Sequence, residues 1–130
     1  MQPLKEIRNV RQVPGEHARR WFTSAELDLI VWVDGSGDPL GFQLCYDKGP
    51  GEKALTRTTS GEVSHACVDD GENRRSGYKE TPVLVSGASF DGARVAWLFT
   101  RAGEDLPEPF FELVMHTIVG HSGFPPSSSP

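Results

Sequence analysis

Two runs of alternating apolar residues, joined by a short turn, constrain the fold of this chain more than any other feature. The run LDLIVWVD (27–34) has an apolar side chain at every second position, and LGFQLCYD (40–47) repeats the pattern. A period of two places these side chains on one face of a strand, while Ile30 and Trp32 partly cover the other. The intervening GSGDP (35–39) has turn composition. The sequence therefore predicts an antiparallel hairpin.

Shorter segments on both sides of the hairpin have the composition of further strands. They are residues 5–13 and 19–23 before the hairpin, and residues 53–58, 63–68 and 83–85 after it. Each is bounded by Gly, Pro or polar turn residues. The long polar segment 69–80 is predicted to be an exposed loop. We therefore expect about five to six strands, each joined to the next by a turn.

After residue 86 the apolar period changes from two to 3.6 residues, which is typical of helices. Two helical stripes follow each other, formed by Val95, Leu98, Phe99 and Ala102 and then by Phe110, Leu113, Val114 and Ile118. Ser89 or Asp91 is predicted to cap the first helix and Asp105 the second. Gly103 and Gly120 are predicted to end them.

This order of elements, strands first and helices last, predicts the fold class. We expect an α+β fold in which an antiparallel β-meander of about five to six strands is followed by two C-terminal α-helices packed on the sheet. The length of 130 residues fits one domain, which we place at residues 1–121. The remaining residues, 122–130, end in PPSSSP and are predicted to be a disordered Ser/Pro tail.

The charge of the chain is unevenly distributed. Residues 1–20 carry five basic and two acidic side chains, whereas the rest carries 8 basic and 16 acidic ones, which together give the net charge of −5. Binding to nucleic acid needs a clustered basic face, so an acidic body makes a nucleic-acid partner an unfavourable interpretation. The basic N-terminal stretch is better interpreted as a charged sheet edge, which deters aggregation.

Cysteine content and hydropathy indicate a cellular location. Cys45 and Cys67 are the only cysteines, and no secretory signal precedes them, so we expect free thiols in a reducing, cytoplasmic environment. No run of about 18 apolar residues is present, and we therefore expect no membrane association. Phosphate-binding and dinucleotide-binding motifs are also lacking, and no cofactor is predicted.

Five segments together resemble a known family. They are RNVRQVPGE (8–16), RRWF (19–22), LDLIVW (27–32), GFQLCYDK (41–48) and VDDGE (68–72). These segments resemble a family of small uncharacterised bacterial proteins found in proteobacterial genomes, and the resemblance covers most of residues 4–85. It implies a bacterial cytoplasmic protein and carries no activity with it. Arg57 stands where the resemblance implies an aromatic residue.

One polar cluster has the residue types of a metal site. His65, Asp69, Asp70 and Glu72 supply an imidazole and three carboxylates, which are ligands for Zn²⁺, Mn²⁺ or Fe²⁺. A facial triad needs a second histidine, and the spacing differs from that of a calcium loop. The same residues are equally typical of a solvated turn closing a strand.

A second candidate site lies on the predicted strands. Gln43, Cys45 and Asp47 alternate outward, and His65 and Cys67 could join them to line a ligand-binding groove. Cys67 also shares a strand face with His65, as a thiolate–imidazolium pair would require. The competing interpretations are a wet sheet face and a small buried thiol.

The helices suggest an interaction surface. Phe111, Met115 and Val119 widen the apolar stripe of the second helix, and Trp97 lies opposite the stripe of the first, flanked by arginines. A helix that apolar is either deeply buried or shared with another protein. The leading hypothesis is therefore a small cytoplasmic binding or protein-interaction domain that self-associates as a homodimer or binds a protein partner. The alternative is a metal-dependent enzyme or ligand-binding domain that uses the His65 cluster.

Overall fold

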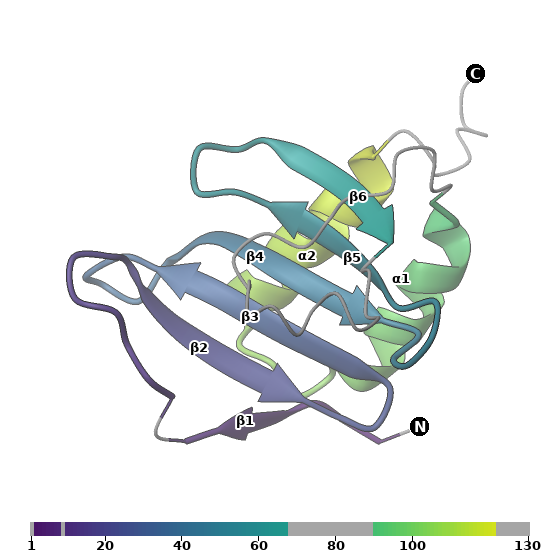
Figure 1. Cartoon of the computed structure of the whole chain (residues 1–130), viewed down its shortest axis with the longest axis horizontal. Coiled ribbons are helices and arrows are strands. Elements are labelled where there is room, and N and C mark those ends of the chain that lie inside the picture. Colours follow the sequence, from purple (N-terminus) through teal and green to yellow (C-terminus); the bar gives the residue numbers. More distant parts are fainter. Residues whose placement is uncertain (1, 9, 68–89, 122–130) are drawn as a thin grey trace.

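The computed structural model of the chain describes residues 2–8, 10–67 and 90–121. Its six strands are β1 (Lys5–Ile7), β2 (Ala18–Thr23), β3 (Leu27–Val33), β4 (Pro39–Tyr46), β5 (Lys53–Arg57) and β6 (Val63–Cys67), and its two helices are α1 (Gly92–Ala102) and α2 (Glu108–Gly120). All neighbouring strands pair antiparallel in the order β1-β2-β3-β4-β5-β6. The predicted α+β meander followed by two helices is thus confirmed (Figure 1). The predicted strand at 83–85, the loop at 69–80 and the tail at 122–130 lie outside the described residues.

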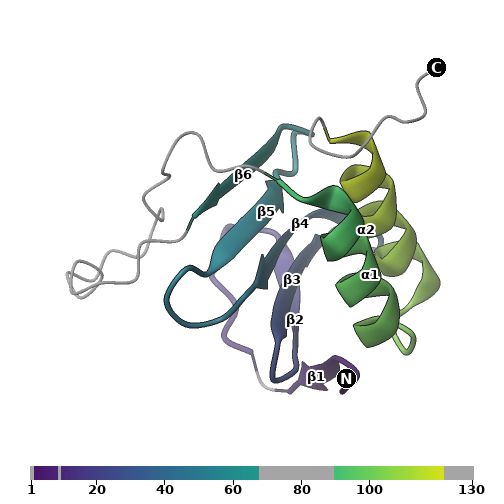
Figure 2. The same cartoon turned by 90° about the vertical axis from the view of Figure 1, so that its right-hand side faces the viewer.

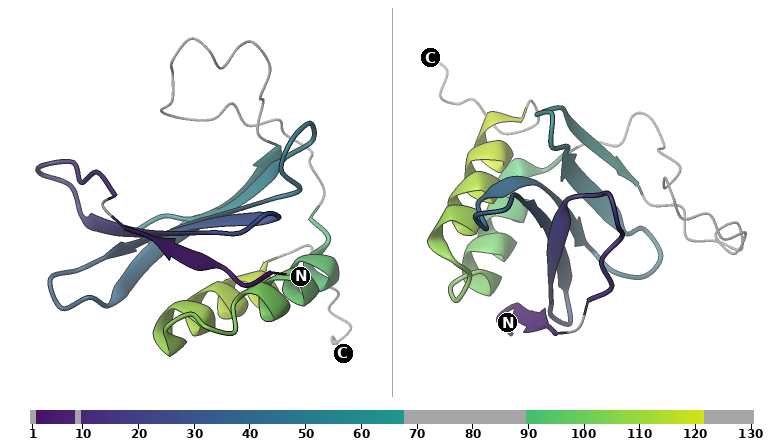
Figure 3. Two further views of the ribbon diagram at one scale, coloured as in Figure 1. Left: turned by 90° about the horizontal axis from the view of Figure 1, so that it is seen from below. Right: turned by 90° about the vertical axis from the view of Figure 1, so that its left-hand side faces the viewer.

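The molecule has two layers, a twisted sheet and a pair of helices on one of its faces (Figure 2). The helices run antiparallel to each other, and α2 packs against β4 near the middle of the sheet. Seen from below, both helices lie on the same side of the strands (Figure 3). No helix in the described ranges is long and apolar enough to span a bilayer.

The core forms between these layers because the strand register aligns the alternating apolar residues. Leu29 of β3 pairs with Leu44 of β4, which pairs with Leu55 of β5, and all three are fully buried. The helices contribute Val95, Phe99, Phe110, Val114 and Ile118 to the same core. Burying a side chain of this size stabilises the folded state by roughly 1.5–3 kcal/mol.

The ends of the two helices are capped in different ways. The carboxylate of Asp91 accepts a hydrogen bond from the Arg94 amide and caps α1, as predicted, and the Gly103 amide closes the other end on the Phe99 carbonyl. The prediction for the second helix was wrong, because its N-cap is Pro107 and no side chain caps it. Asp105 instead lies in the turn between the helices, so it precedes the position from which a side chain could reach the first helical amides.

The N-terminal edge of the sheet is fastened to the helix layer. The amide of Leu4 donates to the carbonyl of Ala102, the last residue of α1, over 2.8 Å. Next to it, the Arg20 guanidinium makes two hydrogen bonds of 2.8 Å to the Glu6 carboxylate and lies 5.1 Å from the ring centroid of Phe110. The basic side chain of Arg20 therefore contacts both the edge strand β1 and the helix α2.

The face of the sheet opposite the helices carries the side chains that alternate with the core residues along each strand. Trp21, Ile30, Gln43, Thr56 and Ser64 lie side by side across five strands in this register. None of these residues faces the helices, since their neighbours along each strand supply the core. We refer to this surface as the open face.

Candidate ligand-binding site

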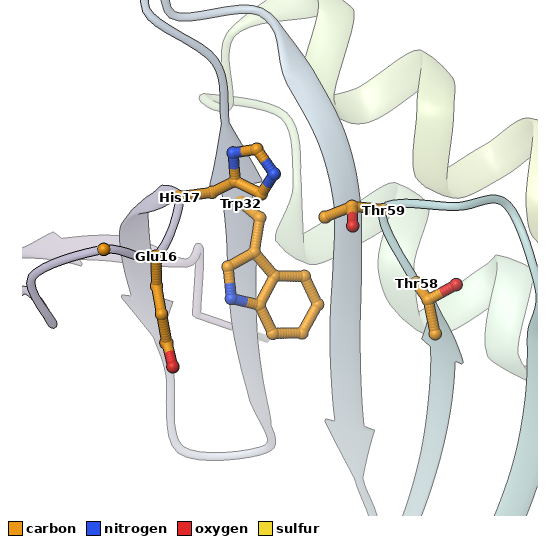
Figure 4. Close-up of a pocket in the computed structure, with 6 residues that line it drawn as sticks. Glu16, His17, Trp32, Thr58 and Thr59 are labelled. Carbon is orange, nitrogen blue, oxygen red and sulfur yellow. The ribbon is translucent and has the colours of Figure 1, made fainter.

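A pocket of about 590 Å³ lies on the open face at the end of the sheet where β2 begins and β3 and β5 end. Its lining consists of Gly15, Glu16, His17, Trp32, Thr58 and Thr59. The indole of Trp32 stands in the middle, with Glu16 and His17 on one side and Thr58 and Thr59 on the other (Figure 4). Pockets of this volume accommodate small organic ligands.

Trp32 reaches this position because its strand alternates. Val31 and Val33 point into the core, so Trp32 between them must point to the open face. Its cross-strand neighbour on β4 is Gly41, which has no side chain to cover the indole. A Cβ atom at Gly41 would lie 2.5 Å from the carbonyl oxygen of Arg57, so the close approach of β5 requires glycine here. The indole is therefore left as the largest side chain in the pocket.

The polar rim of the pocket comes from two turns. Glu16 and His17 follow Gly15, which adopts a positive φ of 87° that favours glycine, and the Glu16 amide donates to the Val13 carbonyl. Across the pocket, the Thr58 hydroxyl accepts a hydrogen bond from the Glu62 amide at 3.1 Å. Thr58 thus rigidifies the β5–β6 turn.

The described lining combines an aromatic ring with several polar side chains. It offers one carboxylate, one imidazole and two hydroxyls around an aromatic ring. Among the described residues, no hydrogen bond joins any two of these polar side chains, as a nucleophile and its base would require. The arrangement can hold a planar or cationic group on the indole and contact its edges with polar atoms.

The residues of the predicted groove lie on both faces of the sheet; they are Gln43, Cys45, Asp47, His65 and Cys67. Gln43 and Cys45 face the open side, and the Gln43 amide donates to the Cys45 sulfur over 3.8 Å. His65 and Cys67 lie on the face of β6 that is turned toward the helices, because His65 pairs with the core residue Leu55. These residues therefore do not line one groove.

Asp47 contacts helix α1, and Cys45 is a largely buried thiol. The Asp47 carboxylate accepts two hydrogen bonds from the Arg94 guanidinium of α1, which hold the pKa of this carboxyl below its usual range. Burial raises the pKa of the Cys45 thiol to about 12, so the thiol stays protonated at neutral pH and is a poor nucleophile.

Of the predicted metal ligands, only His65 lies in the described part of the chain. Its Nε2 atom is 2.5 Å from the Tyr46 hydroxyl, and its ring packs near Phe90 and His121. Asp69, Asp70 and Glu72 lie outside the described residues. Within residues 2–8, 10–67 and 90–121, no group of three or more His, Cys, Asp or Glu side chains could hold a metal ion. The metal hypothesis stays a prediction.

The predicted interface residues divide into two kinds. Phe111 stacks on Phe99 of α1 with ring centroids 5.3 Å apart, and the Met115 sulfur accepts a hydrogen bond from Thr100. Contact with α1 thus accounts for much of the apolar width of α2. In contrast, Trp97 and Val119 are 55% and 51% exposed. The self-association hypothesis therefore depends on these two residues.

The fold and the pocket together define a small α+β domain with a helix-covered face and an open face that carries a tryptophan pocket. Comparisons with protein-family models, with curated proteins and with solved structures find no match.

Our sequence-based interpretation missed the pocket residues outside the strands. Glu16, His17, Thr58 and Thr59 lie in turns and form no motif. A signal was nevertheless present, because an antiparallel meander brings alternate turns to the same end of the sheet. Trp32 precedes one of those turns and alternates onto the face opposite the core.

Proposed function

We propose that this chain is a small binding module whose ligand site is the Trp32 pocket. The observation that carries the proposal is an indole on the open face, within a pocket of about 590 Å³, whose cross-strand neighbour on β4, Gly41, has no side chain to cover it. Aromatic rings combined with a few convergent polar groups are the usual composition of a small-molecule site. The described lining contains no linked pair of catalytic groups, which favours binding over chemistry.

The proposal is tested by screening ¹⁵N-labelled protein against a library of neutral, cationic and anionic fragments. We expect the hits to move the indole signal of Trp32 and the amides of residues 15–17, 58 and 59. Trp21 on the same face and Trp97 on α1 provide internal controls. Trp32→Ala should abolish these responses and leave the remaining spectrum folded. Hits that spread over the surface, or that survive Trp32→Ala, would contradict the proposal.

Self-association is a second candidate function, favoured by the outer side of α1. Trp97 is more than half exposed, and the Arg101 guanidinium lies 4.4 Å above its ring. A hollow of about 520 Å³ lined by Ala93, Ala96 and Thr100 adjoins them. Exposed Trp and Arg side chains are enriched at binding hot spots. We propose a second copy of the chain as the partner.

Sedimentation velocity at several concentrations tests this second candidate. We expect a dimer whose dissociation constant rises at least tenfold in Trp97→Glu, with Val119→Ser having a smaller effect. Glu112→Gln on the same layer is the control that should leave the association unchanged. A chain that sediments as a monomer at every concentration up to several hundred micromolar would eliminate this candidate and leave the pocket unaffected.

A further inference from the structure

We infer that the ligand of the Trp32 pocket is a small organic cation, such as a methylated ammonium compound, an inference that rests on the proposed function. Among the described residues, the lining contains the carboxylate of Glu16 and no lysine or arginine. An aromatic face attracts cations through its quadrupole, and an adjacent carboxylate adds to that attraction. In Figure 4 the indole nitrogen of Trp32 lies on the side toward Glu16, so both groups border the same space.

The Glu16 carboxylate is available for a ligand. Within the described chain it takes part in no hydrogen bond or ion pair, and the residue is exposed. Two carboxylates nearer the middle of the sheet are already engaged, since Asp28 pairs with Lys48 and Asp47 with Arg94. Glu16 therefore differs from them in having its charge uncompensated.

The turns around the pocket reinforce this negative charge. Residues 13–17 of the β1–β2 connection (8–17) and the connections 34–38 and 58–62 lie at the same end of the sheet, on the left in Figure 1. These segments contain Glu16, Asp34, Asp38 and Glu62 but neither lysine nor arginine, while residues 8–12 of the first connection carry Arg8 and Arg11, so the three connections together keep an excess of negative charge. The carboxylate of Asp34 accepts hydrogen bonds from the Ser36 and Asp38 amides, which lower its pKa and keep it ionised. Carboxylates within about one Debye length, roughly 8 Å, raise the local concentration of cations.

Two arginines of the strands beside the pocket, Arg19 and Arg57, do not neutralise it. Arg19 pairs with Trp32 across the strands, but its guanidinium donates two hydrogen bonds to the carbonyl of Arg11 and is not part of the lining. Arg57 pairs with the core residue Phe42 and lines a different cavity beside His116 on the helix side. Neither cation therefore competes for the indole.

The far side of the molecule provides an internal comparison. Trp97 lies in a hollow that also contains a carboxylate, that of Glu104, but there the Arg101 guanidinium already lies over the indole at 4.4 Å. The described chain thus places its own cation on the exposed Trp97 and none on the half-buried Trp32. An added cation is expected to select Trp32.

The test is a pair of NMR titrations with choline and with its neutral isostere, 3,3-dimethylbutan-1-ol, which has the same shape without the charge. We expect choline to shift the Trp32 indole signal saturably, with a dissociation constant on the order of 0.1–1 mM, and to leave Trp97 unchanged. The neutral isostere should bind at least about fivefold more weakly. Glu16→Gln should weaken choline binding about threefold, whereas Glu104→Gln should have no effect.

Equal affinity for the two compounds, no response to choline, or an unchanged affinity in Glu16→Gln would overturn the inference. The proposed function has a separate outcome. If other fragments still bind at Trp32 while choline does not, the pocket binds ligands of another class and only the cation inference fails. If no fragment moves Trp32, the proposed function fails as well.

Discussion

The hydroxyl of Tyr46 and the Nε2 atom of His65 lie 2.5 Å apart between β4 and β6, on the face of the sheet that the helices cover. Their rings are stacked with an interplanar angle of 19°, and Tyr46 is almost completely buried. Burial raises the pKa of the Tyr46 hydroxyl, so it remains protonated throughout the physiological range. The pair is a partly buried polar contact between two strands that do not pair directly with each other.

Removing this link should destabilise the fold without changing its shape. Tyr46→Phe deletes only the hydroxyl and so removes its polar contact with the Nε2 atom of His65. The free energy of unfolding should therefore fall by about 1–2 kcal/mol. Urea denaturation measures this change. A double-mutant cycle with His65→Ala should give a coupling energy of at least about 0.5 kcal/mol. Strictly additive effects would show that the two side chains stabilise the chain independently.

The link between Asp47 and Arg94 should make stability depend on acidity. Hydrogen bonds from Arg94 lower the pKa of the Asp47 carboxyl, so the stabilisation is present above the ordinary Asp value of about 4 and is lost as the pH falls through the lowered pKa. Because Arg94 is half exposed, Arg94→Ala should lower the free energy of unfolding by only about 0.5–1 kcal/mol at pH 7. The difference from wild type should shrink toward pH 2–3, and an equal difference at pH 7 and pH 2 would contradict the assignment.

At alkaline pH the thiol of Cys45 should determine part of the stability. Its pKa rises from 9.0 to about 12 in the folded chain, so the unfolded chain ionises first and stability falls as the pH rises from 9 toward 12. The slope approaches at most about 1.4 kcal/mol per pH unit. Measurements in a Cys67→Ala background isolate this thiol, and Cys45→Ala should flatten the curve. Parallel curves with and without Cys45 would refute the prediction.

Gly41 should tolerate no side chain. A Cβ atom at this position would lie 2.5 Å from the Arg57 carbonyl oxygen and 2.9 Å from a backbone carbon of Thr58, so β5 would have to move. We expect Gly41→Ala to lower the free energy of unfolding by about 2–3 kcal/mol. The matched control is Gly35→Ala, where a Cβ atom meets nothing within 4 Å, and its effect should stay within about 0.5 kcal/mol. Similar thermal melts for both variants would contradict the packing described above.

The two aromatic residues predicted to lie at an interface should behave differently. Phe111 stacks on the buried ring of Phe99, so Phe111→Ala should cost about 2–3 kcal/mol of stability. Trp97 is 55% exposed, and Trp97→Ala should change the free energy of unfolding by less than about 1 kcal/mol. Urea denaturation at low protein concentration separates these effects from association. A large loss in Trp97→Ala under those conditions would mean that Trp97 supports the fold itself.

Alternation and period were sufficient to predict the architecture. The regular spacing of Leu27, Leu29 and Val31 identifies the core face of β3, and the spacing of Val95 and Phe99 does the same for α1. Such patterns are reliable because one face of each element must exclude water. The α+β class, the meander and the two helices therefore follow from the sequence.

The site could not be predicted in the same way, because it depends on which turns meet. Glu16 and Thr58 approach Trp32 only through the register of four strands, and register is not encoded in any one segment. His65 illustrates the same dependence. Alternation within one strand predicts that His65 and Cys67 share a face, but it does not predict whether that face is the one that carries Cys45. Which face of β6 joins the core depends on its pairing with Leu55, a tertiary contact.

The hydrogen bond from Leu4 to Ala102 has a consequence for the order in which the chain assembles. Every strand pairs with its neighbour in sequence, so the sheet can grow hairpin by hairpin through short loop closures. Leu4 instead meets the end of α1 and needs nearly the entire described chain in place first. We expect this contact to form last and open first, which hydrogen exchange at the Leu4 amide would reveal as a rate faster than that of β3. Transient release of this contact would free β1 from the helix layer while the central hairpin stays closed.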